Sequence, residues 1–230
     1  GGILSDTAAS VDAYQMAHEL IAFNVKRGMK VFDQTEIKSI QDQGATPKVI
    51  TQENYTINAQ KIVFCTGFES LNLLKEKVAD LIYTYATVSE PTQTYNKSLE
   101  KILIWDTQDP YLYMRTTDDG RFLVGGEDSV YKDTILQQNI KEEKSKTLIK
   151  KLKKTLPDLD FIEDISWGGI FGTTKDGLPY IGESPEYKNC LFCLGFGGNG
   201  ITFSAQGRKI IVDLLQKKEN NLAQYYRFGR

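Results

Sequence analysis

A cluster of glycines near the end of the sequence is the first feature with chemical meaning. The stretch LFCLGFGGNGITFS places Gly195, Gly197, Gly198 and Gly200 between a strand-like run and a helix-like run. Glycine weakens regular structure by roughly 0.5–1 kcal/mol per residue, so four together need a geometric reason. Two reasons remain open: the turn is tight, or a ligand lies too close to the backbone for any side chain.

A helix that begins after Gly200 would offer unpaired N–H groups and its positive dipole end to phosphate or carbonyl oxygens. The turn is not a P-loop, because no lysine follows the glycines. No strand follows the helix to complete a βαβ unit, which a dinucleotide fingerprint requires. The glycines alone therefore leave a ligand site and a packing turn as alternatives.

A second candidate is the segment YLYMRTT, residues 111–117. Tyr113 and Arg115 flank Met114, so both side chains lie on one face of the expected strand. An arginine on the pocket side can bind a substrate carboxylate through two parallel hydrogen bonds. The alternative is an ordinary arginine on a surface strand.

Other reactive residues support little chemistry. His18 is the one histidine, and we expect it to be solvated or satisfied in the core. Cys65, Cys190 and Cys193 lie in strand-like runs and are expected to act as small buried hydrophobes. We predict no metal site, since a closed zinc site needs four ligands, and no Ser–His–Asp hydrolase.

Composition limits the class of protein. The 230 residues are 40% hydrophobic and 25% charged, which is typical of a soluble globular chain with a proper core. The net charge of −2 argues against nucleic acid or anionic membrane as a partner. No run approaches the ~20 apolar residues of a membrane span and no leader is visible, so we expect a cytoplasmic protein.

The chain alternates few helices with many strands. Helices are expected at 11–26, 136–156 and 201–216, and the run KIVFCTG is expected to be a strand buried on both faces. A meander of three or four strands precedes residue 68, with Gly44 in its first turn. Further strands are expected at 81–90, 101–106, 111–117, 121–127, 161–174, 180–182 and 191–195, with TTDDG as a hairpin turn. This pattern predicts an α+β fold.

Residues 166–215, SWGGIFGTTKDGLPYIGESPEYKNCLFCLGFGGNGITFSAQGRKIIVDLL, resemble a known family signature. They are similar to the C-terminal part of the FAD-dependent oxidoreductases of the D-amino-acid oxidase and glycine oxidase family. There a Trp- or Ala-Gly stretch leads to Asp-Gly-x-Pro-x-x-Gly, a strand and a glycine-rich turn. The matching positions are Trp167, Gly168, Asp176, Gly177, Pro179, Gly182 and Gly197 to Gly200. Residues 1–40 and INAQKIVFCTG resemble the family segments beside the adenine and the dinucleotide.

The resemblance implies a domain organisation. We expect a mixed, largely antiparallel substrate-domain sheet with helices over residues 75–164. Residues 1–74 and 165–230 would form the C-terminal part of a FAD-binding, glutathione-reductase-like domain. The family's N-terminal βαβ unit has no counterpart in this sequence. We therefore expect the C-terminal two-thirds of an enzyme, inactive by itself.

The resemblance also implies the cofactor contacts. The backbone of the turn would lie against the pyrimidine edge of the flavin, through Gly195, Gly197, Gly198, Asn199, Gly200 and Ile201. Thr66 and Gly67 would approach the cofactor, and Ile37 would meet the adenine through main-chain groups, with a plain core position as its alternative. The segment GIFGTTKDG has no cysteine, which implies non-covalent FAD.

Substrate contacts are implied for Tyr113, Arg115, Trp167 and Phe171. Amino-acid oxidases of this family often carry an arginine shortly after the Trp/Ala-Gly stretch, where this chain has Ile170. That departure leaves room for a polyamine-like or other secondary amine.

The implied reaction oxidises a C–N bond of a small amine or amino acid by hydride transfer to flavin N5. A neutral amine needs no dedicated protein base, so no catalytic side chain is assigned. Two alternatives remain: a non-catalytic ligand-binding module on the same scaffold, and a flavin dehydrogenase of hydroxy acids. The oligomeric state and the electron acceptor are left open.

Overall fold

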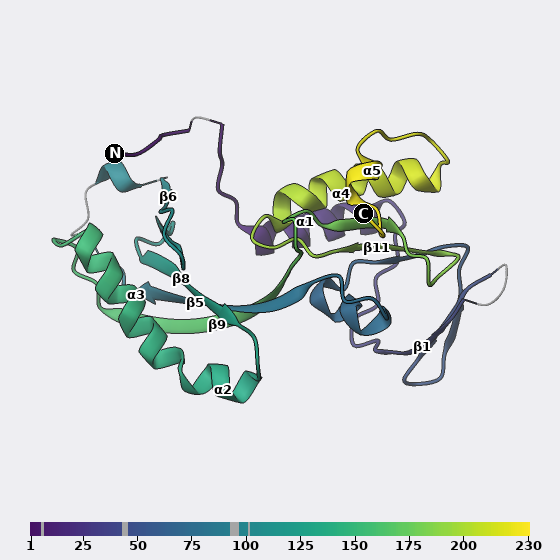
Figure 1. Ribbon diagram of the computed structural model, residues 1–230, viewed down its shortest axis with the longest axis horizontal. Coiled ribbons are helices and arrows are strands. Elements are labelled where there is room, and N and C mark those ends of the chain that lie inside the picture. Colours follow the sequence, from purple (N-terminus) through teal and green to yellow (C-terminus); the bar gives the residue numbers. More distant parts are fainter. Residues whose placement is uncertain (6, 43–45, 93–96, 101) are drawn as a thin grey trace. The chain divides into compact units, whose positions relative to one another are not determined.

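The computed structural model describes residues 1–5, 7–42, 46–92, 97–100 and 102–230 (Figure 1). The expected turn at Gly44 lies outside these residues. The chain divides into two compact units, one formed by residues 1–78 with 174–230 and the other by residues 79–173. Residues 165–173 fall in the second unit because the strand that contains them pairs with a strand of that unit.

The second unit is built on one antiparallel sheet. Its strand order is β6-β7-β8-β5-β9, and every pairing in it is antiparallel. The strands are β5 Asp80–Ser89, β6 Leu103–Trp105, β7 Leu112–Thr116, β8 Phe122–Val130 and β9 Glu163–Thr173. These confirm the expected strands of this region and the expected α+β class. The turn between β7 and β8 is the hairpin expected from TTDDG, since Thr117 N–H donates to the Arg121 carbonyl at 2.9 Å.

Two helices cover one face of this sheet (Figure 1). They are α2 Thr134–Asn139 and α3 Lys141–Thr155, whereas the sequence predicted one helix over 136–156. The chain changes direction at Ile140, which ends α2 and begins α3. Leu148 and Leu152 of α3 are fully buried against sheet residues that include Tyr85 and Val124. These contacts form the core of the unit.

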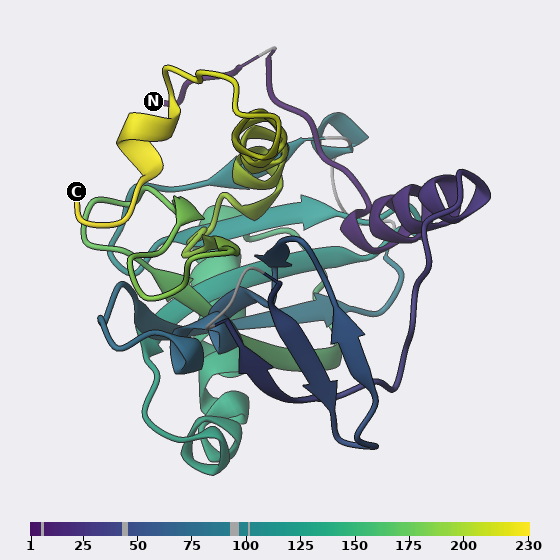
Figure 2. The same ribbon diagram turned by 90° about the vertical axis from the view of Figure 1, so that its right-hand side faces the viewer.

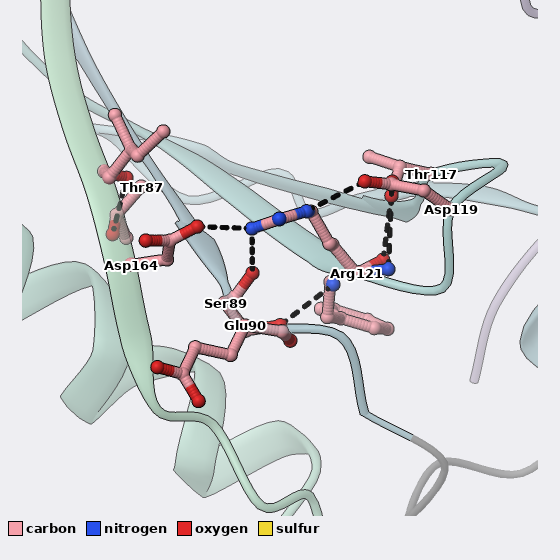
Figure 3. Close-up of polar contacts among 9 residues, drawn as sticks. Thr87, Ser89, Glu90, Thr117, Asp119, Arg121 and Asp164 are labelled. Atoms are coloured by element: carbon pink, nitrogen blue, oxygen red, sulfur yellow. Dashed lines mark hydrogen bonds and ion pairs between the residues drawn. The ribbon is translucent and has the colours of Figure 1, made fainter.

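An arginine ties the hairpin to the neighbouring strands (Figure 3). Arg121 donates to Asp119 at 2.7 Å and to the Ser89 carbonyl at 3.2 Å, and it also pairs with Asp164. The hydroxyl of Ser89 accepts from the Phe122 N–H at 3.0 Å. These contacts therefore hold the neighbouring ends of β8, β5 and β9 together.

The first unit contains two small sheets. In one, β10 Tyr180–Glu183, β11 Cys190–Leu194 and β4 Ile62–Phe64 lie in the order β10-β11-β4, with β11 parallel to β4. The other is the expected meander, drawn dark blue in Figure 2. It consists of β1 Ile37–Gln41, β2 Lys48–Thr51 and β3 Thr56–Asn58.

The first unit also contains the helices α1, α4 and α5. Helix α4, Gly200–Leu215, packs on β10 and β11, and α5 is Ala223–Tyr226. Helix α1, Ala13–Lys26, confirms the first expected helix, and Asp12 caps it by accepting from Gln15 N–H at 2.9 Å. None of its residues is buried. Two 3₁₀ helices, η1 Gly67–Leu73 and η2 Lys97–Leu99, complete the described elements, η2 belonging to the second unit.

The strand expected to be buried on both faces is different in the structure. β4 spans three residues, and only Phe64 is buried while Val63 is 38% exposed. The physical reason is that Ile62 and Phe64 pack on one core cluster, whereas Val63 points to the opposite face of this edge strand. The expectation of a doubly buried strand was therefore wrong.

Helix α4 lies very close to strand β11. A Cβ placed on Gly207 would lie 2.6 Å from Cys193 Sγ and 3.5 Å from Ile181 Cδ1. Since real Cβ atoms do not approach sulfur so closely, a glycine is needed at this crossing.

We expect Gly207→Ala to destabilise the protein by about 1–3 kcal/mol, because the added methyl overpacks the contact with Cys193. Helix propensity alone would stabilise the variant by up to ~1 kcal/mol, so the sign of the change in unfolding free energy is informative. Chemical denaturation measures it. In a Cys193→Ala background the methyl has room and the cost should disappear; an equal cost in both backgrounds would contradict the packing argument.

Candidate functional site

The two glycine-containing segments predicted to bind a cofactor leave the same edge of one sheet. Strands β4 and β11 are parallel, and Phe64 lies opposite Phe192. Thr66 and Gly67 follow β4, and the turn 195–200 follows β11, so both start from the carboxyl ends of adjacent parallel strands. Ligands of open α/β sheets bind at such ends.

The glycines of the turn serve different purposes. Gly195 and Gly197 have φ of +77° and +55°, which favour glycine, and a Cβ on Gly195 would lie 2.8 Å from Thr174 Cγ2. Tight packing and backbone conformation therefore explain these two. Gly198 has no left-handed φ, and a Cβ there would meet nothing within 4 Å. Neither cause explains Gly198, which leaves free space over an exposed backbone.

The start of helix α4 presents free amides at this point. Asn199 makes no side-chain cap, and Phe203 is the first residue whose N–H returns to the turn, donating to the Asn199 carbonyl at 3.0 Å. Within the described ranges, the N–H groups of Gly200, Ile201 and Thr202 have no hydrogen-bond partner. Unpaired amides at a positive helix end suit an electron-rich edge such as that of a flavin pyrimidine. The turn therefore fits the cofactor implied by the sequence.

The other predicted cofactor residues lie in two places. Gly67 has a φ of +57° and open space at its Cβ position, and the Thr66 hydroxyl shares a hydrogen bond of 2.8 Å with Ser70. Ile37 begins β1 in the separate meander and is 44% exposed. Thr66 and Gly67 thus follow the strand adjacent to the one that precedes the glycine turn, whereas Ile37 lies in another sheet.

The predicted substrate residues share the face of the five-stranded sheet opposite to α2 and α3. Tyr113 lies opposite Gly125, Gly125 opposite Ala86, and Ala86 opposite Trp167. Residues directly opposite one another point to the same side, so these form one row across four strands. A Cβ on Gly125 would lie 2.2 Å from Tyr113 Cζ, so the tyrosine ring covers that glycine.

We call this side the open face, since in the described part of the unit no helix packs on it. By strand alternation it carries Thr84, Ala86, Val88, Leu103, Trp105, Tyr111, Tyr113, Arg115, Leu123, Gly125, Ile165, Trp167, Gly169 and Phe171. Four predicted substrate residues are among them. Arg115 donates to the carbonyl of Thr116 at 3.2 Å.

The position of Ile170 changes the comparison with the amino-acid oxidases. Ile170 packs against the core on the helix-covered side, beside Tyr83. Phe171, the next residue, is the one that faces the open side. Neither Ile170 nor Phe171 is an arginine. The chain therefore lacks the arginine that amino-acid oxidases of the family often carry after the Trp/Ala-Gly stretch, although Ile170 itself does not face the substrate side.

Asp176 of the Asp-Gly-x-Pro segment has a structural partner. Arg230 donates to its carboxylate at 2.8 and 3.0 Å and lies 3.8 Å above the ring of Tyr180. Hydrogen bonds from Arg230 hold the pKa of Asp176 well below its usual range. Asp176 therefore stabilises the turn at residues 174–178.

The cysteines lie apart from one another. Cys190 and Cys193 point to opposite faces of β11 and belong to different core clusters. Cys65 is exposed. In the described ranges no group of three or more His, Cys, Asp or Glu side chains is arranged to hold a metal ion. Likewise, no described helix is both long and apolar enough to cross a bilayer.

Two functional candidates were not found from the sequence. Thr84 Oγ1 and Asp128 Oδ1 are buried polar atoms without a hydrogen-bond partner in the described structure. Simple alternation from Gly125 would place Glu127, and not Asp128, on the open face. A bulge in β8 exchanges the orientations of these two residues, so that Asp128 faces the open side. Nothing in the sequence besides Gly126 indicates that bulge.

The chain is similar in sequence to glycine oxidases and to D-amino acid dehydrogenases. Glycine oxidase of Bacillus licheniformis is 28% identical over 191 residues, covering 82% of this chain and 49% of that protein. D-amino acid dehydrogenase of Helicobacter pylori is 23% identical over 225 residues, covering 96% of this chain and 52% of that protein. The chain spans about half the length of the curated relatives it matches.

The fold resembles part of a solved structure. The crystal structure of glycine oxidase from Geobacillus kaustophilus matches with a TM-score of 0.77 at 20% identity, covering 96% of this chain and 59% of that one. The family model described as DAO, FAD dependent oxidoreductase, matches residues 1–214. The chain belongs to this family of FAD-dependent oxidoreductases, which confirms the resemblance, the fold class and FAD as the cofactor.

We expect Cys65 to be alkylated by iodoacetamide at pH 8 long before Cys190 and Cys193. Burial raises the pKa of each of the latter two thiols to about 12, and the thiolate is the reactive form. Partial burial also raises the pKa of Cys65, but this residue is exposed. Timed alkylation with peptide mass spectrometry measures the three rates. Equal rates, or a disulfide between Cys190 and Cys193, would contradict the assignment of these two thiols to the core.

Proposed function

We propose that the protein oxidises a C–N bond of a small amine or amino acid, with non-covalent FAD as the electron acceptor. Membership of the FAD-dependent family and similarity to glycine oxidase and D-amino acid dehydrogenase support this proposal. Bound FAD supplies a two-electron acceptor at N5. In the proposed reaction FAD would accept the hydride lost from the substrate's α carbon, the nitrogen lone pair would form the C=N bond, and the N–H proton would leave to solvent.

The backbone of the glycine turn is proposed to bind the pyrimidine edge of the flavin. Gly198 leaves space for the ring, and the amides of Gly200 and Ile201 offer donors where negative charge gathers on reduction. Thr66 and Gly67 contact the cofactor from the end of β4. Ile37 is assigned to the adenine through its main chain. The space over Gly198 is the observation that carries this assignment.

The open face is proposed to bind the substrate. Trp167 and Phe171 offer apolar surface that removes water from the reacting carbon, while Tyr113 and Arg115 offer polar groups that orient the molecule. Orientation and desolvation are sufficient for hydride transfer from a neutral amine, so no side chain acts as a base. This surface excludes water and positions the substrate.

We expect a graded series at Gly198 to lower FAD affinity without lowering apo-protein stability. In the full-length protein, Gly198→Ala should weaken FAD binding modestly and Gly198→Val by about tenfold or more, because the side chain fills the space assigned to the ring. Fluorescence titration of apo-protein with FAD gives the affinities, and thermal unfolding of apo-protein gives the control. Unchanged FAD affinity in both variants would leave the turn without a cofactor role.

We expect anaerobic bleaching of the flavin by secondary amines or amino acids and not by 2-hydroxy acids. The visible absorbance of the FAD-loaded, full-length protein is recorded before and after each substrate class is added. Bleaching by hydroxy acids alone would replace the amine oxidation with an alcohol oxidation. A protein that binds FAD and is bleached by neither class would not be this oxidoreductase.

A further inference from the structure

A bulge in β8 turns Asp128 toward the open face. Gly126 and Glu127 have φ of +134° and +55°, and the register with β5 shifts between Tyr83 and Tyr85. An extra residue in one strand reverses the alternation that follows it. Glu127 therefore faces the helix side and Asp128 the opposite side.

The two adjacent acids have different surroundings. Glu127 forms ion pairs with Lys144, at 3.2 Å, and with Lys151, both on α3. Asp128 forms no ion pair with any Lys or Arg in the described ranges, and its Oδ1 is buried without a hydrogen-bond partner. Thr84, which stands opposite the bulge, likewise buries an unpartnered Oγ1.

Aromatic rings flank this carboxylate. Tyr111 lies beside the bulge, since its carbonyl oxygen would be 2.2 Å from a Cβ placed on Gly126. Burial, the negative charge of Asp128 and a hydrogen bond to the Asp128 carboxylate raise the pKa of Tyr111 to about 12. The rings of Tyr111 and Tyr113 lie 6.2 Å apart. On the far side of Thr84, Gly169 adds no side chain, and a Cβ there would meet nothing within 4 Å. The open space over Gly169 thus lies across Thr84 from Asp128, and the two tyrosine rings lie on the β7 side.

These surroundings favour a cation. A buried carboxylate oxygen without a donor is costly, and an N–H group of an ammonium or guanidinium ion would satisfy it. Aromatic faces also attract cations. A substrate carboxylate at this point would instead be repelled by Asp128. Arg115 is a cation of the open face, but it lies opposite Leu123, four residues along the chain from Tyr111.

We propose that Asp128, together with Tyr111 and Thr84, binds a cationic group of the substrate away from the C–N bond being oxidised. The preferred substrate would be an amine that carries a second ammonium or guanidinium group. This inference rests on the proposed function and narrows its substrate class.

Two matched probes test it: N-methyl-1,4-diaminobutane and N-methylpentylamine, which differ in a terminal ammonium against a methyl group. With the full-length, FAD-loaded protein, calorimetry should show about tenfold or tighter binding of the diamine, and flavin bleaching should show a similar preference in rate. Asp128→Asn keeps the size of the side chain and should abolish the preference. The control Glu127→Gln removes a neighbouring charge on the other face and should leave the preference intact.

The outcomes separate the two proposals. If both amines bind and bleach the flavin equally and Asp128→Asn changes neither, the cation site is overturned and the amine oxidation stands. If the diamine binds preferentially and Asp128→Asn weakens it while no amine bleaches the flavin, the cation site stands and the oxidation fails. Absence of diamine binding overturns the site. If Asp128→Asn does not fold, the comparison of the two amines in the unaltered protein decides.

Discussion

The antiparallel pairing of β5 with β8 on one side and β9 on the other is the constraint on which the second unit depends. This pairing sends Tyr83 and Tyr85 into the core against α3 and leaves Thr84 and Ala86 on the open face. Because alternation has a period of two, each strand presents one set of residues to the helices and the other to the open face. A slip of one residue would bury Trp167 and expose the core.

In the first unit the equivalent constraint is the parallel pairing of β4 with β11. It brings together two segments that are more than a hundred residues apart, Thr66–Gly67 and the glycine turn. Gly207 allows α4 to lie close on β11, so the start of the helix is held where its amides face outward from the same edge. The turn thereby combines close packing at Gly195 with open space at Gly198.

Much of the fold was predictable from the sequence because it follows local patterns. Alternation and turn residues located the strands of both units, and the resemblance identified the family. The errors arose where tertiary position decides: the apolar run of β4 does not reveal an edge strand, and the helical period over 136–156 does not reveal the break at Ile140.

Part of the candidate site was beyond sequence reasoning for a related reason. The family comparison selected Ile170, but only the register of β9 shows that Phe171 faces the open side. Asp128 was hidden because the bulge at Gly126 and Glu127 changes the alternation, and a bulge depends on backbone torsions that the residue pattern does not state. Glu127, with its two lysine partners, has the surroundings of a structural acid.

The central claim, that the glycine turn binds the flavin, is tested most directly by hydrogen–deuterium exchange of the full-length protein with and without FAD. The account predicts slower exchange on FAD binding for the amides of residues 198–202 and for Thr66 and Gly67, with no change in α3. Equal exchange of residues 198–202 in both forms would contradict it, and the glycines would then serve only to shape a turn.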